Sequence, residues 1–303
     1  MNNYRNKGVF LLPFLIFSIL LFFFKAYADE YIDETGRKVN IPPSPKRIVS
    51  LAPSITETLF ALGLDEKIVG VTTFSDYPEA ARSKPRVGSY VSISLEKVVS
   101  LSPDLIIGTA DGNKIETVEQ LERVGFPVYM INPTNLDEIF KMVLDIGRVT
   151  GKENEAKKLV YNLRERVRIV VSQTADLKKP KVFFQIGIDP IVTVGSNTLH
   201  NELITLAGGI NISGNETTKY PRYSIEEIIV RQPEIIIVSS MKRGGDFKRV
   251  SNKWKRWEDI PAIKDNRIHI FNTDLTDHPS PRIVDGLEEI TKIIHPEVSF
   301  KND

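Results

Sequence analysis

Cysteine is missing from all 303 residues of the chain. Its absence excludes disulfide bonds, thiolate metal sites and a cysteine nucleophile. It also excludes the lipid-modified cysteine that tethers many exported bacterial proteins to a membrane. Any functional site in this chain must therefore be built from other side chains.

Histidine is scarce, and the usual enzyme motifs are missing. The four histidines form neither an H-E-x-x-H motif nor a close pair, so an imidazole-rich metal site is not expected. The chain has no G-x-S-x-G elbow, no P-loop and no G-x-G-x-x-G sequence. We therefore expect a protein that is not an enzyme and that holds no metal and no cofactor.

The chain also lacks an excess of either charge. Residues 1–28 contain three of the 40 Lys and Arg residues and no acid, which leaves 37 basic and 39 acidic side chains in the remainder. Binding of nucleic acid needs a concentrated basic face, and no such face is indicated here. We therefore expect no nucleic-acid partner.

Long apolar runs are confined to the N-terminus. Arg5 and Lys7 precede an apolar stretch over residues 9–24, which is followed by Ala26-Tyr27-Ala28. This order is typical of a secretory signal peptide over residues 1–28, cut after Ala28. An uncleaved membrane anchor is the alternative, because the apolar stretch is long for a signal. An exported chain without a lipid tether is expected in the periplasm.

One motif occurs twice, 130 residues apart. SLEKVVSLSPDLIIG begins at Ser94, and SIEEIIVRQPEIIIV begins at Ser224. Each copy has a Glu two residues after its Ser, at Glu96 and Glu226, and a Tyr four residues before it, at Tyr90 and Tyr220. An upstream helix is also repeated, so that Glu202 in NTLHNELITLAGG matches Glu57 in SITETLFALGL. The repetition predicts two lobes of similar design.

Strands alternate with helices along both halves of the chain. After a hairpin over residues 31–45, the hydrophobic pattern predicts strands at 47–51, 68–71, 105–107 and 128–131, with helices at 55–62, 95–101, 115–124 and 136–150. The second half predicts strands at 181–186, 235–238 and 268–271 and helices at 196–209 and 281–294, and the second copy of the motif predicts a helix before the strand at 235–238. This alternation is typical of mainly parallel sheets covered by helices.

A long amphipathic segment without Gly or Pro separates the halves. We predict an α/β fold of two Rossmann-like lobes, at residues 29–150 and 180–303, joined by one long rigid helix over residues 151–179. Tyr77, Tyr90, Tyr220 and the segment DLTDHPSP from Asp274 lie in loops beside strand ends, where open α/β sheets bind ligands. A cleft with tyrosines on both walls suits a large, ring-bearing, partly polar ligand.

At these residues the chain resembles the helical-backbone class of periplasmic binding proteins, which serve ABC importers of cobalamin, haem and iron-siderophores. The likeness spans residues 47–294 and is strongest to the corrinoid binders, in the segments FSDYPEAARSKPRVGSY, SLEKVVSLSPDLII, VFFQIGIDP and SPRI. It implies a monomeric receptor that captures cobalamin or a related corrinoid between two lobes. The receptor then delivers it to the permease dimer of an ABC importer in the inner membrane.

The resemblance also implies roles for single residues. Tyr77, Tyr90 and Tyr220 would contact the ligand, and Asp274 would hydrogen-bond it. Glu96 and Glu226, one on each lobe, would dock onto arginines of the two-fold permease, since paired opposite charges orient an encounter. The alternative to docking is that each glutamate only stabilises its own helix, because the helix dipole favours an acid at a helix start.

The chain departs from the corrinoid-binder pattern in its pocket. Ala110 stands in place of a tryptophan, Ile186 and Val192 in place of two phenylalanines, and His278 in place of an arginine. We expect His278 to contact the corrinoid rim or its cobalt. Haem or a ferric siderophore is the alternative cargo, although the loops are poor in basic residues. A hydrolase or a metal-cluster protein on the same frame is disfavoured by the missing nucleophile motifs and cysteines.

Overall fold

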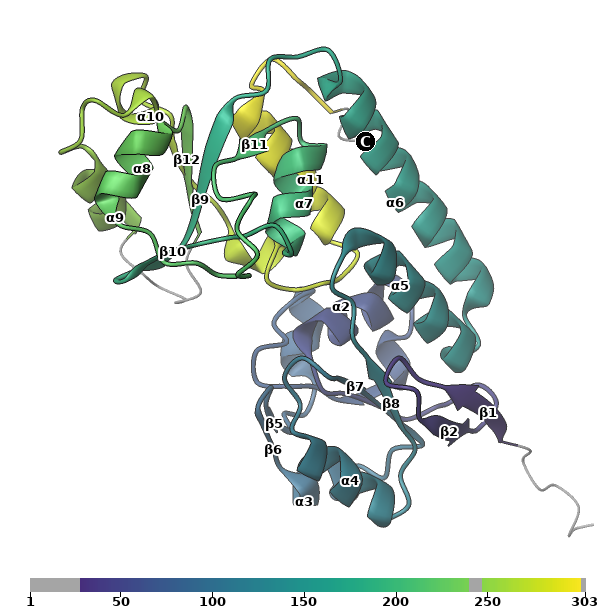
Figure 1. Ribbon diagram of the computed structural model, residues 1–303. Coiled ribbons are helices and arrows are strands. Elements are labelled where there is room, and N and C mark those ends of the chain that lie inside the picture. The colour runs from purple at the N-terminus through teal and green to yellow at the C-terminus, as the bar shows by residue number, and fades with distance from the viewer. Residues whose placement is uncertain (1–27, 240–246, 301–303) are drawn as a thin grey trace, which may run out of the picture.

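The computed structural model describes residues 28–239 and 247–300 and contains two α/β lobes. Figure 1 shows the lobes one above the other, with the long helix α6 (Glu153–Thr174) running along one side of both. The predicted α/β fold of two lobes with mainly parallel sheets is thereby confirmed. The predicted signal peptide over residues 1–28 lies almost wholly outside the described residues. Within them, no helix has the length and apolar character that a membrane crossing requires.

The first lobe is built on a four-stranded parallel sheet. Its strand order is β4 (Ile68–Gly70), β3 (Ile48–Ser50), β7 (Leu105–Thr109) and β8 (Val128–Ile131). Before the sheet, β1 (Asp29–Ile32) and β2 (Lys38–Ile41) form the predicted antiparallel hairpin. Short strands β5 (Gly88–Ser89) and β6 (Ser92–Ile93) form a second small hairpin beside the repeat helix.

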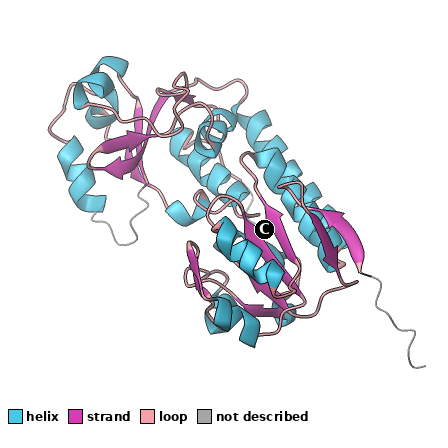
Figure 2. Ribbon diagram, turned by 60° about the horizontal axis from the view of Figure 1, so that its bottom comes forward, coloured by secondary structure: helices cyan, strands magenta, loops and turns pink. Residues whose placement is uncertain are grey.

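Alternate residues of these strands face two different apolar clusters, as the period of two in a strand requires. Ile107 and Tyr129 pack with α2 (Pro53–Ala61) and α5 (Leu136–Thr150). Ile106 and Val128 pack on the other face with α3 (Leu95–Ser100) and α4 (Ile115–Arg123). Figure 2 shows strands lying between helices in this way. The sheet is therefore buried on both faces.

The second lobe repeats this plan. Its sheet has the order β10 (Ile191–Thr193), β9 (Lys181–Ile188), β12 (Ile235–Val238) and β13 (Ile268–Ile270), and β11 (Ile210–Asn211) also pairs with β9. All pairs are parallel except β10 with β9. The helices are α7 (Leu199–Leu206), α8 (Ile225–Arg231), α9 (Phe247–Trp254), α10 (Pro261–Lys264) and α11 (Ile283–Ile294). Three short 3-10 turns, at Asp65–Lys67, Glu79–Ser83 and Thr273–Leu275, complete the described structure.

One apolar core extends through α6 into both lobes. Ala156, Val160, Leu163 and Val170 of this helix belong to the same buried cluster as α2 and α5 of the first lobe and α7 and α11 of the second. Ion pairs on the outside strengthen the attachment to the second lobe, since Arg166 lies 2.6 Å from Asp285 and binds Glu288 through two hydrogen bonds. The packing makes α6 a rigid side support for both lobes.

Most predicted elements are present with differences at their ends, and short elements such as β10 and β11 were not predicted. The linking helix is shorter than predicted, ending at Thr174 instead of residue 179, so its length is about 33 Å. Helix α5 begins and ends where predicted, because Asn135 accepts a hydrogen bond from the Glu138 amide and Gly151 closes the helix with a φ of 74°. The lobe boundaries at residues 150 and 180 stay a prediction.

Candidate functional site

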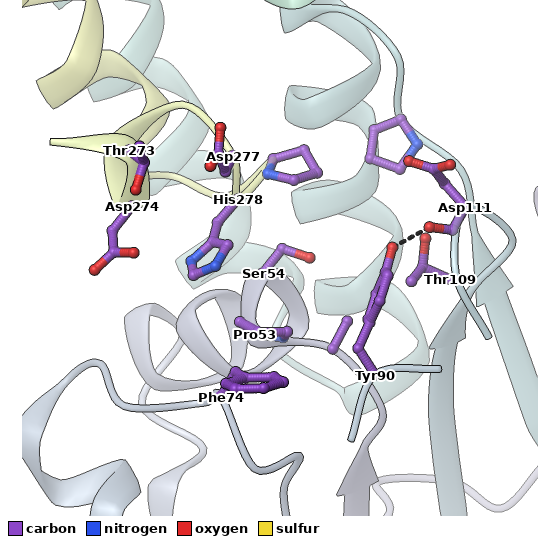
Figure 3. Close-up of a pocket in the computed structure, with 13 residues that line it drawn as sticks. Pro53, Ser54, Phe74, Tyr90, Thr109, Asp111, Thr273, Asp274, Asp277 and His278 are labelled. Carbon is purple, nitrogen blue, oxygen red and sulfur yellow. Dashed lines mark hydrogen bonds between the residues drawn. The ribbon is translucent and has the colours of Figure 1, made fainter. Parts of the chain in front are cut away.

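A cleft opens between the lobes on the loops that follow the strands. Its main chamber has a volume of about 610 Å³ and takes residues from both lobes. In Figure 3, Pro53, Ser54, Phe74 and Tyr90 of the first lobe face Thr273, Asp274, Asp277 and His278 of the second. This cleft lies between the two lobes at the strand ends, which is where the ligand site is predicted.

Two further pockets adjoin this chamber. One, of about 560 Å³, shares the walls formed by Asp111, Pro133, Asp277 and Pro279 with the main chamber and continues to Tyr220. The other, of about 110 Å³, shares Phe74, Asp274 and His278 with the main chamber and ends at Tyr77. All five residues predicted to bind ligand thus line one connected group of pockets.

Tyr90 forms part of the wall of the main chamber. It sits in the turn between β5 and β6, and its hydroxyl donates a hydrogen bond to the backbone carbonyl of Asp111 (Figure 3). Gly112 permits this close approach, because any side chain there would collide with the Tyr90 ring. Burial, together with the nearby Asp111 carboxylate, raises the pKa of Tyr90 to about 12. The phenol therefore stays neutral at physiological pH.

Tyr77 and Tyr220 are each about half exposed and lie at opposite ends of the connected pockets. The Arg282 guanidinium lies 3.7 Å from the centre of the Tyr77 ring, a cation–π contact. Burial raises the pKa of Tyr220, and the carboxylates of Asp111 and Asp277 raise it further. Tyr220 therefore lies near acids of both lobes and keeps its phenolic proton.

Asp274 and His278 come from one loop of the second lobe, between β13 and α11. Asp274 lies in a 3-10 turn that Asn272 caps, with a distance of 3.1 Å from the Asp274 amide to Asn272 Oδ1. His278 Nδ1 lies 2.9 Å from Oε1 of Glu57, a buried carboxylate of the first lobe. Since a carboxylate accepts, Nδ1 is the donor. The other ring nitrogen, Nε2, has no hydrogen-bond partner among the residues that the structure describes.

Several wall residues were not singled out from the sequence. They are Phe74, Asp111 and Asp277, together with Ser54, Thr109 and Thr273. Asp277 lies in the DLTDHPSP segment that the sequence placed beside a strand end, and Asp111 follows β7, but an acid at such a place can equally be an exposed loop residue. Phe74 is 46 % exposed, which is unusual for a large apolar side chain. Its position three residues before Tyr77 was the available signal.

The residues that depart from the corrinoid-binder pattern differ in position. Ala110 and Ile186 line the second chamber. Val192 does not belong to the described wall of any of these three pockets, and instead packs in β10 against Gly187 of β9. His278 lines the main chamber and the small pocket. Three of the four departures therefore lie where they can change the shape of the cleft.

Glu96 and Glu226 occupy matching places at the starts of α3 and α8, and both are exposed. Neither carboxylate forms an ion pair or a hydrogen bond with another described residue. In α8 the capping box is formed by Ser224 and Glu227, with Ser224 N 2.8 Å from Glu227 Oε2, so Glu226 is not needed for it. Figure 1 shows α3 and α8 away from α6, one on each lobe.

The described residues offer no place for a bound metal ion of the usual kind. Among residues 28–239 and 247–300, no group of three or more His, Asp or Glu side chains is arranged to hold one. The cleft walls instead combine aromatic rings with hydroxyl and carboxylate groups. Such walls suit noncovalent binding of an organic ligand.

Known proteins with similar sequences fit this architecture. The family model described as periplasmic binding protein matches residues 48–274. The vitamin B12-binding protein of Vibrio parahaemolyticus is 30% identical over 81% of this chain and 88% of its own length. That of Vibrio cholerae is 31% identical over 82% of this chain and 89% of its own length.

Solved structures extend the comparison to another ligand class. The periplasmic vitamin B12-binding protein of Vibrio cholerae has a TM-score of 0.72 at 30% identity, covering 84% of this chain and 98% of its own. A periplasmic heme-binding protein from Roseiflexus has a TM-score of 0.74 at 27% identity, covering 83% and 98%. The protein therefore belongs to the periplasmic binding protein family, as a non-enzymatic substrate-binding component of ABC transport.

Proposed function

We propose that the protein captures cobalamin or a related corrinoid in the inter-lobe cleft and delivers it to an ABC importer. The observation that carries this proposal is the pair of adjoining chambers, of about 610 and 560 Å³, with walls from both lobes. A single chamber of this size suits a drug-sized ligand, and the connected pair suits a considerably larger one. The similarity to vitamin B12-binding proteins over four fifths of the chain supports the same ligand class.

The chemistry of the walls matches a corrinoid. The corrin ring has apolar faces and edges rich in amide side chains. Phe74, Tyr90 and Tyr220 offer flat aromatic surface, and tyrosine adds a hydroxyl at its edge. Asp274 and Asp277 can accept hydrogen bonds from amide NH₂ groups. The site thus offers contact to ring and rim without requiring a charged cargo.

The replaced residues bear on which corrinoid is carried. Ala110 and Ile186 leave more open space in the second chamber than the larger aromatic side chains of the corrinoid-binder pattern would. We propose that this chamber receives the lower-base side of the ligand, where corrinoids differ most from one another. A ligand with a different lower base is then accommodated by the same frame.

Isothermal titration calorimetry tests the proposed cargo directly. The chain from Asp29 onward is titrated with cyanocobalamin, cobinamide, haem and a ferric siderophore. We expect one-to-one binding of cyanocobalamin in the nanomolar-to-micromolar range, with cobinamide reporting whether the lower base is read. Heat from haem or a siderophore together with silence from both corrinoids would overturn the corrinoid assignment and leave the transport role intact.

Haem is the second candidate, favoured by one observation. Glu57 accepts from Nδ1 of His278, which leaves Nε2 as the free nitrogen of a ring that lines the main chamber. A histidine oriented by a carboxylate is a common arrangement for a metal ligand. If haem is the cargo, a Soret shift on mixing should be lost in His278→Ala. A spectrum that is the same for both proteins would remove His278 as an iron ligand.

A ferric siderophore fits less well. Anionic siderophores call for free basic groups, whereas Arg282 is engaged by Glu57 and by the Tyr77 ring. Lys219 lines the second chamber, and Arg82 lines the small pocket. Arg222 is exposed and is not among the wall residues of the three connected pockets. The described wall of the main chamber contains no Lys or Arg, and its three carboxylates, Asp111, Asp274 and Asp277, favour a neutral or weakly charged cargo.

We also propose that Glu96 and Glu226 dock the receptor onto its importer. Their exposure, their matching positions and their lack of a structural partner support a role at an interface. Two carboxylates on pseudo-symmetric lobes suit a two-fold partner with basic groups, and opposite charges both speed and orient the encounter. The proposed compartment is the periplasm, in which the monomeric receptor meets the permease dimer of the inner membrane.

A further inference from the structure

Two glutamates cross the boundary between the lobes, each from the repeated helix of its own lobe. Glu57 lies in α2 of the first lobe and Glu202 in α7 of the second. Their side chains do not simply point into their own lobes. Each carboxylate instead contacts the segment that begins the last helix of the other lobe, α11 in one case and α5 in the other.

The Glu57 carboxylate has three hydrogen-bonding partners, all in the second lobe. Its Oε1 lies 2.9 Å from His278 Nδ1 and 3.4 Å from a guanidinium nitrogen of Arg282, and its Oε2 accepts from Ser280 Oγ at 2.6 Å. The residue is only 4 % exposed. A buried carboxylate is strongly destabilising unless it is paired and hydrogen-bonded. Among the described residues its side-chain partners all belong to the other lobe, so lobe contact is what satisfies it.

The Glu202 carboxylate has a simpler contact. Its Oε2 accepts a hydrogen bond from the backbone amide of Leu136, the first residue of α5, at 2.9 Å. A helix N-terminus has unpaired amides and a partial positive charge, and both favour a carboxylate. Burial raises the pKa of Glu202, and two acids of the same helix start, Asp137 and Glu138, raise it further, although the hydrogen bond from Leu136 lowers it.

We propose that Glu57 and Glu202 are reciprocal braces that set the orientation of the two lobes, and that only the Glu57 brace also positions the ligand site. His278 lines the main chamber, and Arg282 lies on the Tyr77 ring in the small pocket. Through these two partners Glu57 fixes cleft side chains of the second lobe from the first. Leu136, the partner of Glu202, is not a described wall residue of the three connected pockets.

The chemistry of the partners predicts different responses to the same substitution. A glutamine at position 202 keeps an oxygen that can accept from the Leu136 amide. A glutamine at position 57 keeps one oxygen and presents an NH₂ group to a set of three donors, so at least one buried donor loses its partner. Glu57→Gln should therefore break its brace, whereas Glu202→Gln should preserve its brace and Glu202→Ala should remove it.

Spin labels provide a readout of lobe orientation that does not depend on the cargo. Because the chain has no cysteine, Gln120→Cys in α4 and Lys264→Cys in α10 give one exposed label site on each lobe. Pulsed electron paramagnetic resonance then measures the inter-lobe distance distribution of the ligand-free protein. We expect Glu57→Gln and Glu202→Ala to broaden or shift this distribution and Glu202→Gln to leave it unchanged.

Ser280→Ala is a second variant that tests the same contact in case Glu57→Gln does not fold. It removes the 2.6 Å hydrogen bond from the second lobe's side and adds no polar group, so it should also broaden the distribution. If Glu57→Gln, Ser280→Ala and Glu202→Ala all keep the parent distribution, the braces do not set lobe orientation and the proposal is wrong. If Glu57→Gln does not fold, Ser280→Ala and Glu202→Ala decide the question.

The second arm measures ligand affinity and rests on the proposed corrinoid function. Loss of one hydrogen bond to a charged group predicts about tenfold weaker cyanocobalamin binding in Glu57→Gln, and at most about twofold in Glu202→Ala. Equal losses in both variants would overturn the claim that only Glu57 positions the site. If the parent protein does not bind cyanocobalamin, the corrinoid assignment fails, while the distance measurement still decides the braces.

Discussion

The first lobe lines the main chamber with residues from several separate loops, whereas the second lobe does so through a single loop. Phe74, Tyr90 and Asp111 come from three different segments of the first lobe. Asp274, Asp277 and His278 all lie in one seven-residue segment of the second lobe, 273–279. The duplicated frame therefore carries two different site designs. The first wall supplies two aromatic rings and the carboxylate of Asp111, and the second supplies two carboxylates and an imidazole.

The two walls of the main chamber also differ in the hydrogen bonds that fix their side chains. The Tyr90 hydroxyl bonds within its own lobe, to the Asp111 carbonyl. The loop of the second lobe is instead held from across the boundary, by Glu57. The wall of the second lobe thus depends on the first lobe more than the reverse. Substitutions that act on one lobe at a time can test this asymmetry.

The largest effect is expected where the lobes are most alike, at Glu96 and Glu226. The double charge reversal Glu96→Lys and Glu226→Lys should abolish ligand uptake by cells that carry the matching importer, because like charges then meet across the interface. Ligand affinity in solution should be unchanged. The matched control reverses two exposed acids elsewhere, Glu119→Lys and Asp265→Lys. Uptake that survives the first pair, or fails equally with the second, would contradict docking through these residues.

The next effect compares one tyrosine from each lobe, Tyr90 in the main chamber and Tyr220 in the second chamber. Tyr90→Ala and Tyr220→Ala should each weaken cyanocobalamin binding about tenfold, and the double variant about a hundredfold, since each removes an aromatic contact surface. Calorimetry measures both. Tyr161→Ala, at an exposed position of α6 outside the cleft, should not change the affinity. A double variant that binds like the parent would show that these tyrosines are not part of the site.

A smaller effect should distinguish the two copies of the repeat helix. Ser224 forms a full capping box with Glu227, whereas Ser94 only accepts from the Lys97 amide, at 3.4 Å. Ser224→Ala should therefore destabilise the protein by about 1 kcal/mol, and Ser94→Ala by about half of that. Urea unfolding of the two variants provides the measurement. Equal losses, or a larger loss at Ser94, would rule out the capping box as the source of the difference.

The smallest effect concerns pH. Burial and the neighbouring Asp137 and Glu138 raise the folded-state pKa of Glu202 above its unfolded value, although Arg164 pairs with Asp137 at 3.2 Å. The native state therefore binds this proton more tightly, and stability falls as the pH rises from the unfolded pKa through the folded one. Glu202→Gln avoids this loss.

The stability of Glu202→Gln relative to the parent protein should depend on pH in a defined direction. The variant should be slightly more stable than the parent at pH 7, because it carries no charge beside the two acids. The difference should shrink as the pH falls below the ordinary range of a glutamate, where the parent side chain is protonated in both states. Thermal unfolding at pH 7 and at about pH 4 provides the test. A variant that gains stability only at the lower pH would have the opposite sign and contradict this account.

The sequence predicted the fold more completely than the site. Elements with strong local signals were predicted to within a residue or two, and α5 to the residue, because Asn135 and Gly151 mark its ends. Strands β10 and β11 were not predicted, since three-residue and two-residue edge pairings carry too little periodicity. The helix α6 ends five residues earlier than predicted, because apolar spacing does not mark a C-terminus without a Gly or Pro.

At the site, the sequence identified residue types but not their partners. Tyr77, Tyr90, Tyr220, Asp274 and His278 all line the connected pockets, and their role in binding stays a prediction. The matching of Glu57 with Glu202 was visible as a repeat. That each reaches into the other lobe was not, because its partners lie tens to hundreds of residues away and only the tertiary fold brings them together.

The apolar core that passes through α6 has a consequence for the order of folding. Its last members, in α11, are Ile283, Val284, Leu287, Ile290 and Ile294, close to the C-terminal end of the described chain. A nascent chain therefore cannot close this core until α11 has been synthesised. The buried face of α6 stays without its full set of packing partners until that helix has emerged.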